Sequence, residues 1–121
     1  ERARQHARCL PQVRLLVAPE EYPRLLAGAG FVLCTSSVSA YEALALEKPL
    51  AVFQVAANQR RVGGLIAQRG LGENLGEWGT FTEDDVARVL FREWKKPVPS
   101  VNLNGAVEVA RTVRAWLEDR H

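Results

Sequence analysis

Two short apolar runs, each followed by a polar turn and a helical pattern, constrain the fold of this chain more than any other feature. The first run, residues 31–34, leads through a hydroxyl-rich turn into a helical pattern over residues 38–46. The second run, residues 50–55, leads into a helical pattern over residues 58–68. A nearly continuous apolar strand is typical of a parallel sheet that is covered on both faces. The alternation therefore predicts right-handed βαβ units and an α/β domain with a mostly parallel sheet.

The other segments continue this alternation. Apolar residues three and four apart indicate helices, and β-branched runs between turn residues indicate strands. We expect a polar helical stub over residues 1–9, a strand over 13–17, a helix over 20–29, a short edge strand over 71–75, a helix over 82–94, a connection over 95–100 and a last helix over 104–119.

Length and composition limit the class of protein. A chain of 121 residues, 47% apolar and 25% charged, is typical of one globular domain. Its 16 basic and 14 acidic residues give a net charge of +2, which does not favour nucleic acid or an anionic membrane as a partner. No apolar stretch is long enough to predict a membrane span. The chain has no methionine, so we expect it to be a piece of a longer protein.

The cysteines and histidines indicate a reduced, metal-free protein. Cys9 and Cys34 form no CxxC pair, so they predict free thiols and a cytoplasmic location. His6 and His121 lie near the chain ends with no metal-ligand spacing around them, so we expect no metal site. Cys34 lies at a strand end, where burial would make it a structural thiol and a helix N-terminus could lower its pKa.

The two polar turns, residues 34–37 and 55–58, both follow predicted strands. In a parallel sheet, ligands bind beyond the carboxyl ends of the strands, so these turns predict a site at one edge. The N-terminus of a helix presents free N–H groups and suits a phosphate. Glu42 lies about one turn deeper in its helix and can accept hydrogen bonds from a sugar diol. The arrangement is one way to hold a nucleoside diphosphate.

The stretch over residues 32–70 also carries a family pattern. A strand is followed by a small-residue turn, a serine, an aromatic residue, a glutamate, a Lys-Pro pair, a second strand and an Asn-Gln pair. The residues that fit are Ser39, Tyr41, Glu42, Pro49, Asn58 and Gln59. The pattern resembles the C-terminal domain of nucleotide-sugar enzymes of the GT-B fold. It is most similar to the UDP-sugar hydrolase of pseudaminic acid biosynthesis and the spore coat polysaccharide biosynthesis group. A more distant relative is the N-acetylglucosaminyltransferase of peptidoglycan synthesis.

The resemblance implies a fold and roles for the edge residues. Residues 1–121 would form a single nucleotide-sugar-binding domain, a Rossmann-like three-layer domain that is the C-terminal half of a GT-B fold. Backbone N–H groups of residues 37–39 and the Ser39 hydroxyl would hold the diphosphate, and Glu42 would bind the ribose hydroxyls. Asn58 and Gln59 would face the sugar or its phosphate. The loop over residues 18–20 would lie near the base. The predicted nucleotide-sugar-binding residues are Ser36, Ser37, Ser39, Glu42, Asn58 and Gln59.

The resemblance also implies what the chain lacks. The reactive acid or base would come from an N-terminal domain, so no catalytic residue and no cofactor is predicted here. The expected partners are a UDP-sugar and that domain, within a hydrolase or glycosyltransferase of surface-glycan or nonulosonic acid biosynthesis. Two positions depart from the pattern, because Ser36 and Ser37 replace a glycine pair and Ala57 replaces an acidic residue. These departures keep open a degenerate, non-catalytic module used for ligand sensing or assembly.

Ordinary helix capping explains some of the same residues. Ser39 and Glu42 have the spacing of a capping box, in which a glutamate folded back on its cap would not reach a ribose. Asn58 also suits the N-cap of the helix that follows it. Thr82 and Asp85 have the same capping spacing, which predicts a helix start at this position.

Overall fold

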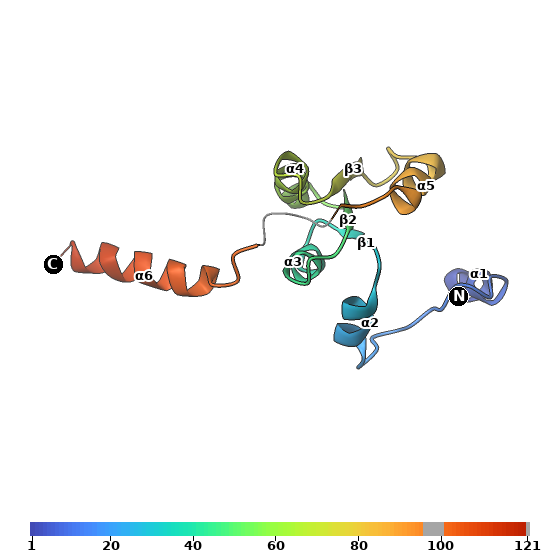
Figure 1. Cartoon of the computed structure of the whole chain (residues 1–121), viewed down its shortest axis with the longest axis horizontal. Coiled ribbons are helices and arrows are strands. Elements are labelled where there is room, and N and C mark those ends of the chain that lie inside the picture. The colour runs from blue at the N-terminus through green and yellow to red at the C-terminus, as the bar shows by residue number, and fades with distance from the viewer. Residues whose placement is uncertain (96–100, 121) are drawn as a thin grey trace.

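The structure is a computed structural model and describes residues 1–95 and 101–120. Helices and strands alternate along the central part of the chain (Figure 1). The elements are α1 (Arg2–Arg8), α2 (Tyr22–Gly28), β1 (Val32–Thr35), α3 (Val38–Ala45), β2 (Leu50–Gln54), the 3-10 turn η1 (Ala57–Gln59), α4 (Arg60–Gln68), β3 (Glu73–Glu77), α5 (Glu83–Phe91) and α6 (Gly105–Glu118).

The three strands form one open sheet in the order β1-β2-β3. Both strand pairs are parallel, with Val32 opposite Leu50 and Thr35 opposite Phe53 in the first pair. The prediction of an α/β fold with a parallel sheet is therefore confirmed. Because neighbouring parallel strands end at the same edge, the turns after β1 and β2 lie beside each other, as the sequence predicts.

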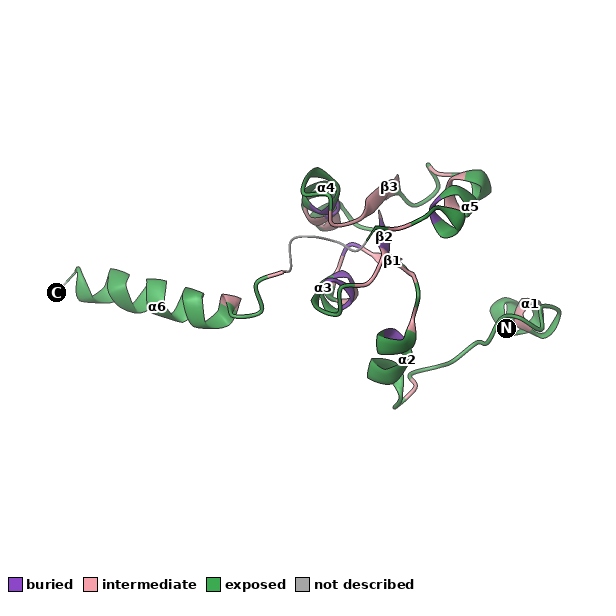
Figure 2. Ribbon diagram, in the orientation of Figure 1, coloured by how far each residue is buried: buried purple, intermediate pink, exposed green. Residues whose placement is uncertain are grey.

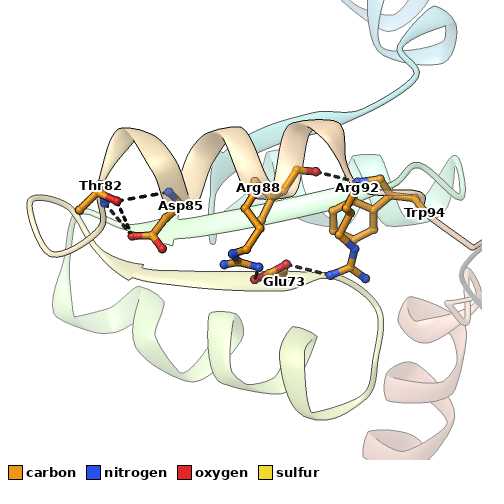
Figure 3. A network of polar contacts seen from close by, with 7 residues as sticks. Glu73, Thr82, Asp85, Arg88, Arg92 and Trp94 are labelled. Atoms are coloured by element: carbon orange, nitrogen blue, oxygen red, sulfur yellow. Dashed lines mark hydrogen bonds and ion pairs between the residues drawn. The ribbon is translucent and has the colours of Figure 1, made fainter.

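Helices cover the two faces of the sheet. Leu50 and Val52 of β2 point toward α3 and α4, and α5 lies on the face opposite α4 (Figure 3). Figure 2 shows that the buried residues are concentrated in these elements. The main core consists of Leu26, Ala40, Ala43, Leu44, Leu50, Val52 and Ile66. Small alanines on α3 let this helix pack closely on the sheet.

A charged cluster fastens α5 to β3. Glu73 of β3 forms ion pairs with Arg88 and Arg92 of α5 (Figure 3). Trp94 follows the C-terminal end of α5, and its indole N–H donates to the Val89 carbonyl in the last turn of this helix at 2.8 Å. The Trp94 ring also packs on Phe31, with ring centroids 5.4 Å apart. These contacts hold the C-terminal end of α5 against the start of β3, at the edge of the sheet opposite the turn between β3 and α5.

One predicted strand is absent and another is displaced. Residues 13–17 form no strand, and the apolar side chains of Leu15, Leu16 and Val17 are exposed. A β-branched run becomes a strand only where a neighbour supplies hydrogen bonds, and β1 pairs with β2 alone among the described residues. The edge strand predicted at residues 71–75 lies at Glu73–Glu77 instead. This strand is at the edge of the sheet, where polar and charged residues are tolerated, so the apolar pattern did not mark its end.

Helix α6 stands away from the rest of the chain (Figures 1 and 2). It confirms the predicted last helix, but none of its residues is buried. Val109, Val113 and Trp116 share one helix face and are exposed. Most of the connection predicted over residues 95–100 lies outside the described residues.

Candidate functional site

The carboxyl ends of the three strands form the candidate site. Backbone hydrogen bonds hold its loops in place: the Ser36 N–H donates to the Phe53 carbonyl at 2.9 Å, and the Trp78 N–H donates to the Gln54 carbonyl at 2.7 Å. The first bond joins the turn after β1 to β2, and the second joins the turn after β3 to β2. The three turns therefore form one continuous polar rim.

A buried polar cluster lies beneath this rim. The Gln54 amide donates to the Ser36 hydroxyl at 2.8 Å and to the Asn74 side-chain oxygen at 2.7 Å. The Asn74 oxygen also accepts from the Gly76 N–H at 3.0 Å. Gly63 of α4 lies directly against the cluster, where an added Cβ would be 2.3 Å from the Gln54 amide nitrogen. Side chains from the turn after β1, the end of β2 and the first half of β3 thus form one network, and at position 63 only glycine leaves room for it.

The three predicted serines have different positions. Ser36 is 1% exposed and its hydroxyl belongs to the buried cluster, so the predicted contact with a diphosphate does not fit its position. The Ser37 hydroxyl pairs with the Thr35 hydroxyl at 2.8 Å, and the Ser37 N–H donates to the Thr35 carbonyl at 2.8 Å. Ser39 lies in the first turn of α3, where helix N–H groups lack intrahelical partners. Ser39 is therefore the serine best placed to meet a ligand.

Glu42 lies on the exposed side of α3 and faces α2. The Tyr22 hydroxyl donates to its Oε2 at 3.2 Å. The interpretation of Ser39 and Glu42 as a capping box is wrong. Helix α3 begins at Val38 with Ser37 as its N-cap, so Ser39 lies inside the helix. A hollow of about 310 Å³ lies beside this contact and is lined by Tyr22, Pro23, Leu26, Glu42, Ala45 and Leu46. The carboxylate thus lies between α3 and the first turn of α2.

Cys34 lies in β1 close to this carboxylate. Burial and, as a smaller cause, the negative charge of Glu42 raise the pKa of the Cys34 thiol to about 11. The alternative of a thiol activated by a helix N-terminus is therefore wrong, because activation requires a lowered pKa. Cys34 packs against the main core, which supports its interpretation as a structural thiol.

The Asn-Gln pair follows β2 as predicted but does not cap as expected. The helical turn η1 begins after Ala56, so Asn58 lies within it, and the N-cap interpretation of Asn58 is wrong. Gln59 immediately precedes α4, and its side-chain oxygen accepts from the Val55 N–H at 2.9 Å. The Gln59 side chain thus fixes the turn, whereas Asn58 is exposed at the rim.

A pocket of about 320 Å³ opens beside this turn, between the ends of β2 and β3. Its lining consists of Gln54, Val55, Ala56, Ala57, Arg60, Glu77 and Trp78. Arg60 and Glu77 form an ion pair at its wall. The sequence interpretation missed Glu77 and Trp78 because it placed β3 two residues too early. It missed Gln54 because this residue lies inside the predicted apolar strand. With the strand ending at Glu77, its last residue and the following tryptophan fall on the predicted ligand edge.

No group of three or more histidines, cysteines or acidic residues within residues 1–95 and 101–120 could hold a metal ion, and His121 lies outside that range. None of the described helices combines the length and apolar character needed to cross a bilayer. The chain matches no protein-family model, and no curated protein and no solved structure is significantly similar to it.

Proposed function

We propose that this domain is the nucleotide-sugar-binding half of a two-domain, GT-B-like enzyme of surface-glycan or nonulosonic acid biosynthesis. Its ligand is a UDP-sugar, and the reaction is hydrolysis or glycosyl transfer. The reactive acid or base comes from a second domain of the same protein, which closes over the edge of the sheet. The proposal places the enzyme in the cytoplasm, where nucleotide sugars are used.

The parallel register of β1 and β2 carries this proposal. With Thr35 opposite Phe53, the turn that holds Ser39 and the turn that holds Asn58 end at the same edge. Such an edge is where open α/β sheets bind their ligands. The likeness of residues 32–70 to the GT-B pattern supports a nucleotide sugar over other phosphorylated ligands.

The order of groups along the edge suits the parts of such a ligand. Glu42 and the hollow beside Tyr22 lie on the β1 side, where the ribose and base would bind. Ser39 lies next, at the start of α3, where backbone N–H groups favour a diphosphate. The pocket beside Arg60 lies toward β3, where the sugar would bind. The outer strands are about 10 Å apart, which is a suitable span for a diphosphate and its flanking groups.

A second candidate function is a degenerate module that senses a ligand or assists assembly. The serine turn favours this alternative, because the N–H groups of Ser36 and Ser37 already donate to backbone carbonyls. A glycine pair would let the backbone approach a phosphate closely, and two serines restrict that approach. The alternative predicts no measurable affinity for uridine nucleotides.

NMR titration of the isotopically labelled chain with UDP, 2′-deoxy-UDP and uridine separates these functions. We expect UDP to bind with a dissociation constant on the order of 0.1–1 mM, because one domain leaves much of the ligand in water. UDP should bind more tightly than uridine, since the start of α3 favours an anion. The 2′-deoxy form should bind more weakly by roughly 1–2 kcal/mol, because it leaves the Glu42 carboxylate partly unpaired.

Glu42→Gln tests the ribose contact directly, with Glu47→Gln as a matched control. Both carboxylates are exposed, but Glu47 lies beyond the end of α3. Glu42→Gln should abolish the difference between UDP and its 2′-deoxy form, and Glu47→Gln should preserve it. Absence of any shift at several millimolar UDP would reject the nucleotide site and favour the degenerate module.

A further inference from the structure

The pocket between the ends of β2 and β3 has walls of three chemical kinds. Trp78 supplies an aromatic surface, Arg60 and Glu77 supply a charged pair, and residues 55–57 supply small aliphatic residues. Its volume of about 320 Å³ is at the small end of the range for ligand pockets, about 300–1,000 Å³. The pocket therefore suits one ring better than a whole nucleotide.

Trp78 is exposed yet held in place. Trp78 is 69% exposed. This exposure is unusual, because a tryptophan in a folded protein generally buries a large apolar area. Its ring contacts Phe53 at a centroid distance of 5.5 Å and Phe81 at 5.9 Å. The Trp78 N–H is also fixed to the Gln54 carbonyl. A rigid, exposed aromatic ring offers a stacking surface at little cost in conformational entropy.

The charges of the pocket cancel. The Arg60 guanidinium is paired with the Glu77 carboxylate, so the wall offers both donors and acceptors but little net charge. A phosphate would bring two or more negative charges close to Glu77, which disfavours phosphate at this position. A neutral ligand with neighbouring hydroxyl groups can donate to Glu77 and accept from Arg60 without disturbing that balance.

From this combination we infer that the pocket binds the pyranose ring of a neutral sugar, with the apolar face of the ring on Trp78 and its hydroxyls on Arg60 and Glu77. This inference rests on the proposed function, because the sugar is the part of the nucleotide sugar beyond the diphosphate. It assigns the sugar-binding role to three residues beyond the Asn-Gln pair. Trp78 would then determine the affinity for the sugar, while Glu42 determines the affinity for the nucleotide.

A titration with UDP-N-acetylglucosamine, UDP and free N-acetylglucosamine tests the inference. The readouts are the dissociation constants and the indole N–H signal of Trp78 in the NMR spectrum. We expect UDP-N-acetylglucosamine to bind about fivefold more tightly than UDP, because ring stacking adds a modest increment. Trp78→Ala should remove this preference while leaving the affinity for UDP unchanged.

Trp116→Ala is the matched control, because Trp116 is also an exposed tryptophan, 52% exposed, but lies on α6. This variant should keep the fivefold preference. Retention of the preference in Trp78→Ala, with its spectrum otherwise native, would overturn the inference while UDP binding still supported the nucleotide site. Shifts of Trp78 with free N-acetylglucosamine but none with UDP would support the pocket and reject the nucleotide proposal. No shift of Trp78 with any of the three probes would overturn the inference.

Glu77→Gln provides an independent test of the charge argument. The substitution leaves Arg60 without its ionic partner, so the pocket becomes positively charged. UDP should then bind about threefold more tightly, whereas the preference for the sugar nucleotide should fall. Unchanged affinities for both ligands would contradict the assignment of Glu77 to the pocket.

Discussion

The Tyr22 hydroxyl and the Glu42 carboxylate, twenty positions apart in the chain, form a hydrogen bond of 3.2 Å between α2 and α3. The carboxylate proposed to bind ribose is thus already engaged when no ligand is present. A ribose must share Glu42 with Tyr22 or displace the phenol. The start of α2 is thereby coupled to the nucleotide side of the site.

Tyr22→Phe should strengthen the binding of UDP by about threefold, because a competing donor is removed from Glu42. The same change should leave the affinity for 2′-deoxy-UDP nearly constant. Tyr41→Phe is the control, because Tyr41 is also an exposed tyrosine but lies outside the Tyr22–Glu42 hydrogen bond. NMR titration measures the affinities, and an equal change for both nucleotides would argue against a ribose contact at Glu42.

Gly63→Ala should destabilise the fold by about 1–3 kcal/mol, the usual cost of overpacking a core. The new methyl group would lie 2.3 Å from the Gln54 amide nitrogen and 2.9 Å from the Ser36 hydroxyl. Urea unfolding followed by circular dichroism measures the change. Gly64→Ala is the control, since nothing lies within 4 Å of its added Cβ and alanine favours a helix. That variant should be as stable as the parent or more stable, and an equal loss in both would contradict the packing argument.

The stability conferred by the Thr82 cap should depend on pH. The Thr82 N–H and hydroxyl both donate to Asp85, which lowers the pKa of this carboxyl below its ordinary value. The folded state therefore favours the carboxylate, so the stabilisation is complete above the ordinary Asp pKa of about 3.9 and is lost as pH falls through the lower folded value. Asp85→Asn should thus be less stable than the parent at pH 6, and the difference should shrink near pH 2. A difference independent of pH would show that the charge of Asp85 is not involved.

Cys34 should react slowly with alkylating reagents. A pKa of about 11 leaves only about one thousandth of the thiol ionised at pH 8, and the thiolate is the reactive form. In a Cys9→Ser variant, the rate of alkylation by iodoacetamide should rise with pH toward a midpoint near 11. Adding Glu42→Gln should lower that midpoint only partly, because burial is the larger cause of the raised pKa. A midpoint below 9 in the folded protein would contradict the position of Cys34.

The sequence predicted the strand–helix units well because their signals are local. The apolar run that became β2 and the small residues of α3 have one stable placement, inside a sheet covered by helices. The Thr82 cap was also predicted correctly, since both partners lie within one helical turn. The prediction of a strand over residues 13–17 was wrong for the opposite reason. Strand formation depends on a neighbouring strand that the local sequence does not specify.

The candidate site was harder to predict because its contacts are between segments far apart in the chain. Ser36 lies in a hydroxyl-rich turn that is typical of a ligand site. Its hydroxyl is nevertheless buried, because it accepts a hydrogen bond from Gln54, which also donates to Asn74. Glu42 fits a capping box by spacing, but its partner is Tyr22 on another helix. Sequence spacing indicated which turns reach the edge, and only tertiary contacts determined which side chains face outward.

The strands pair in the order in which they occur, so each strand of the sheet pairs with the next strand along the chain. Everything proposed to contact the nucleotide sugar lies between residue 18 and Trp78, inside one uninterrupted stretch. A protease that removed the exposed segments at both ends would therefore leave a smaller fragment that still carried the entire binding edge.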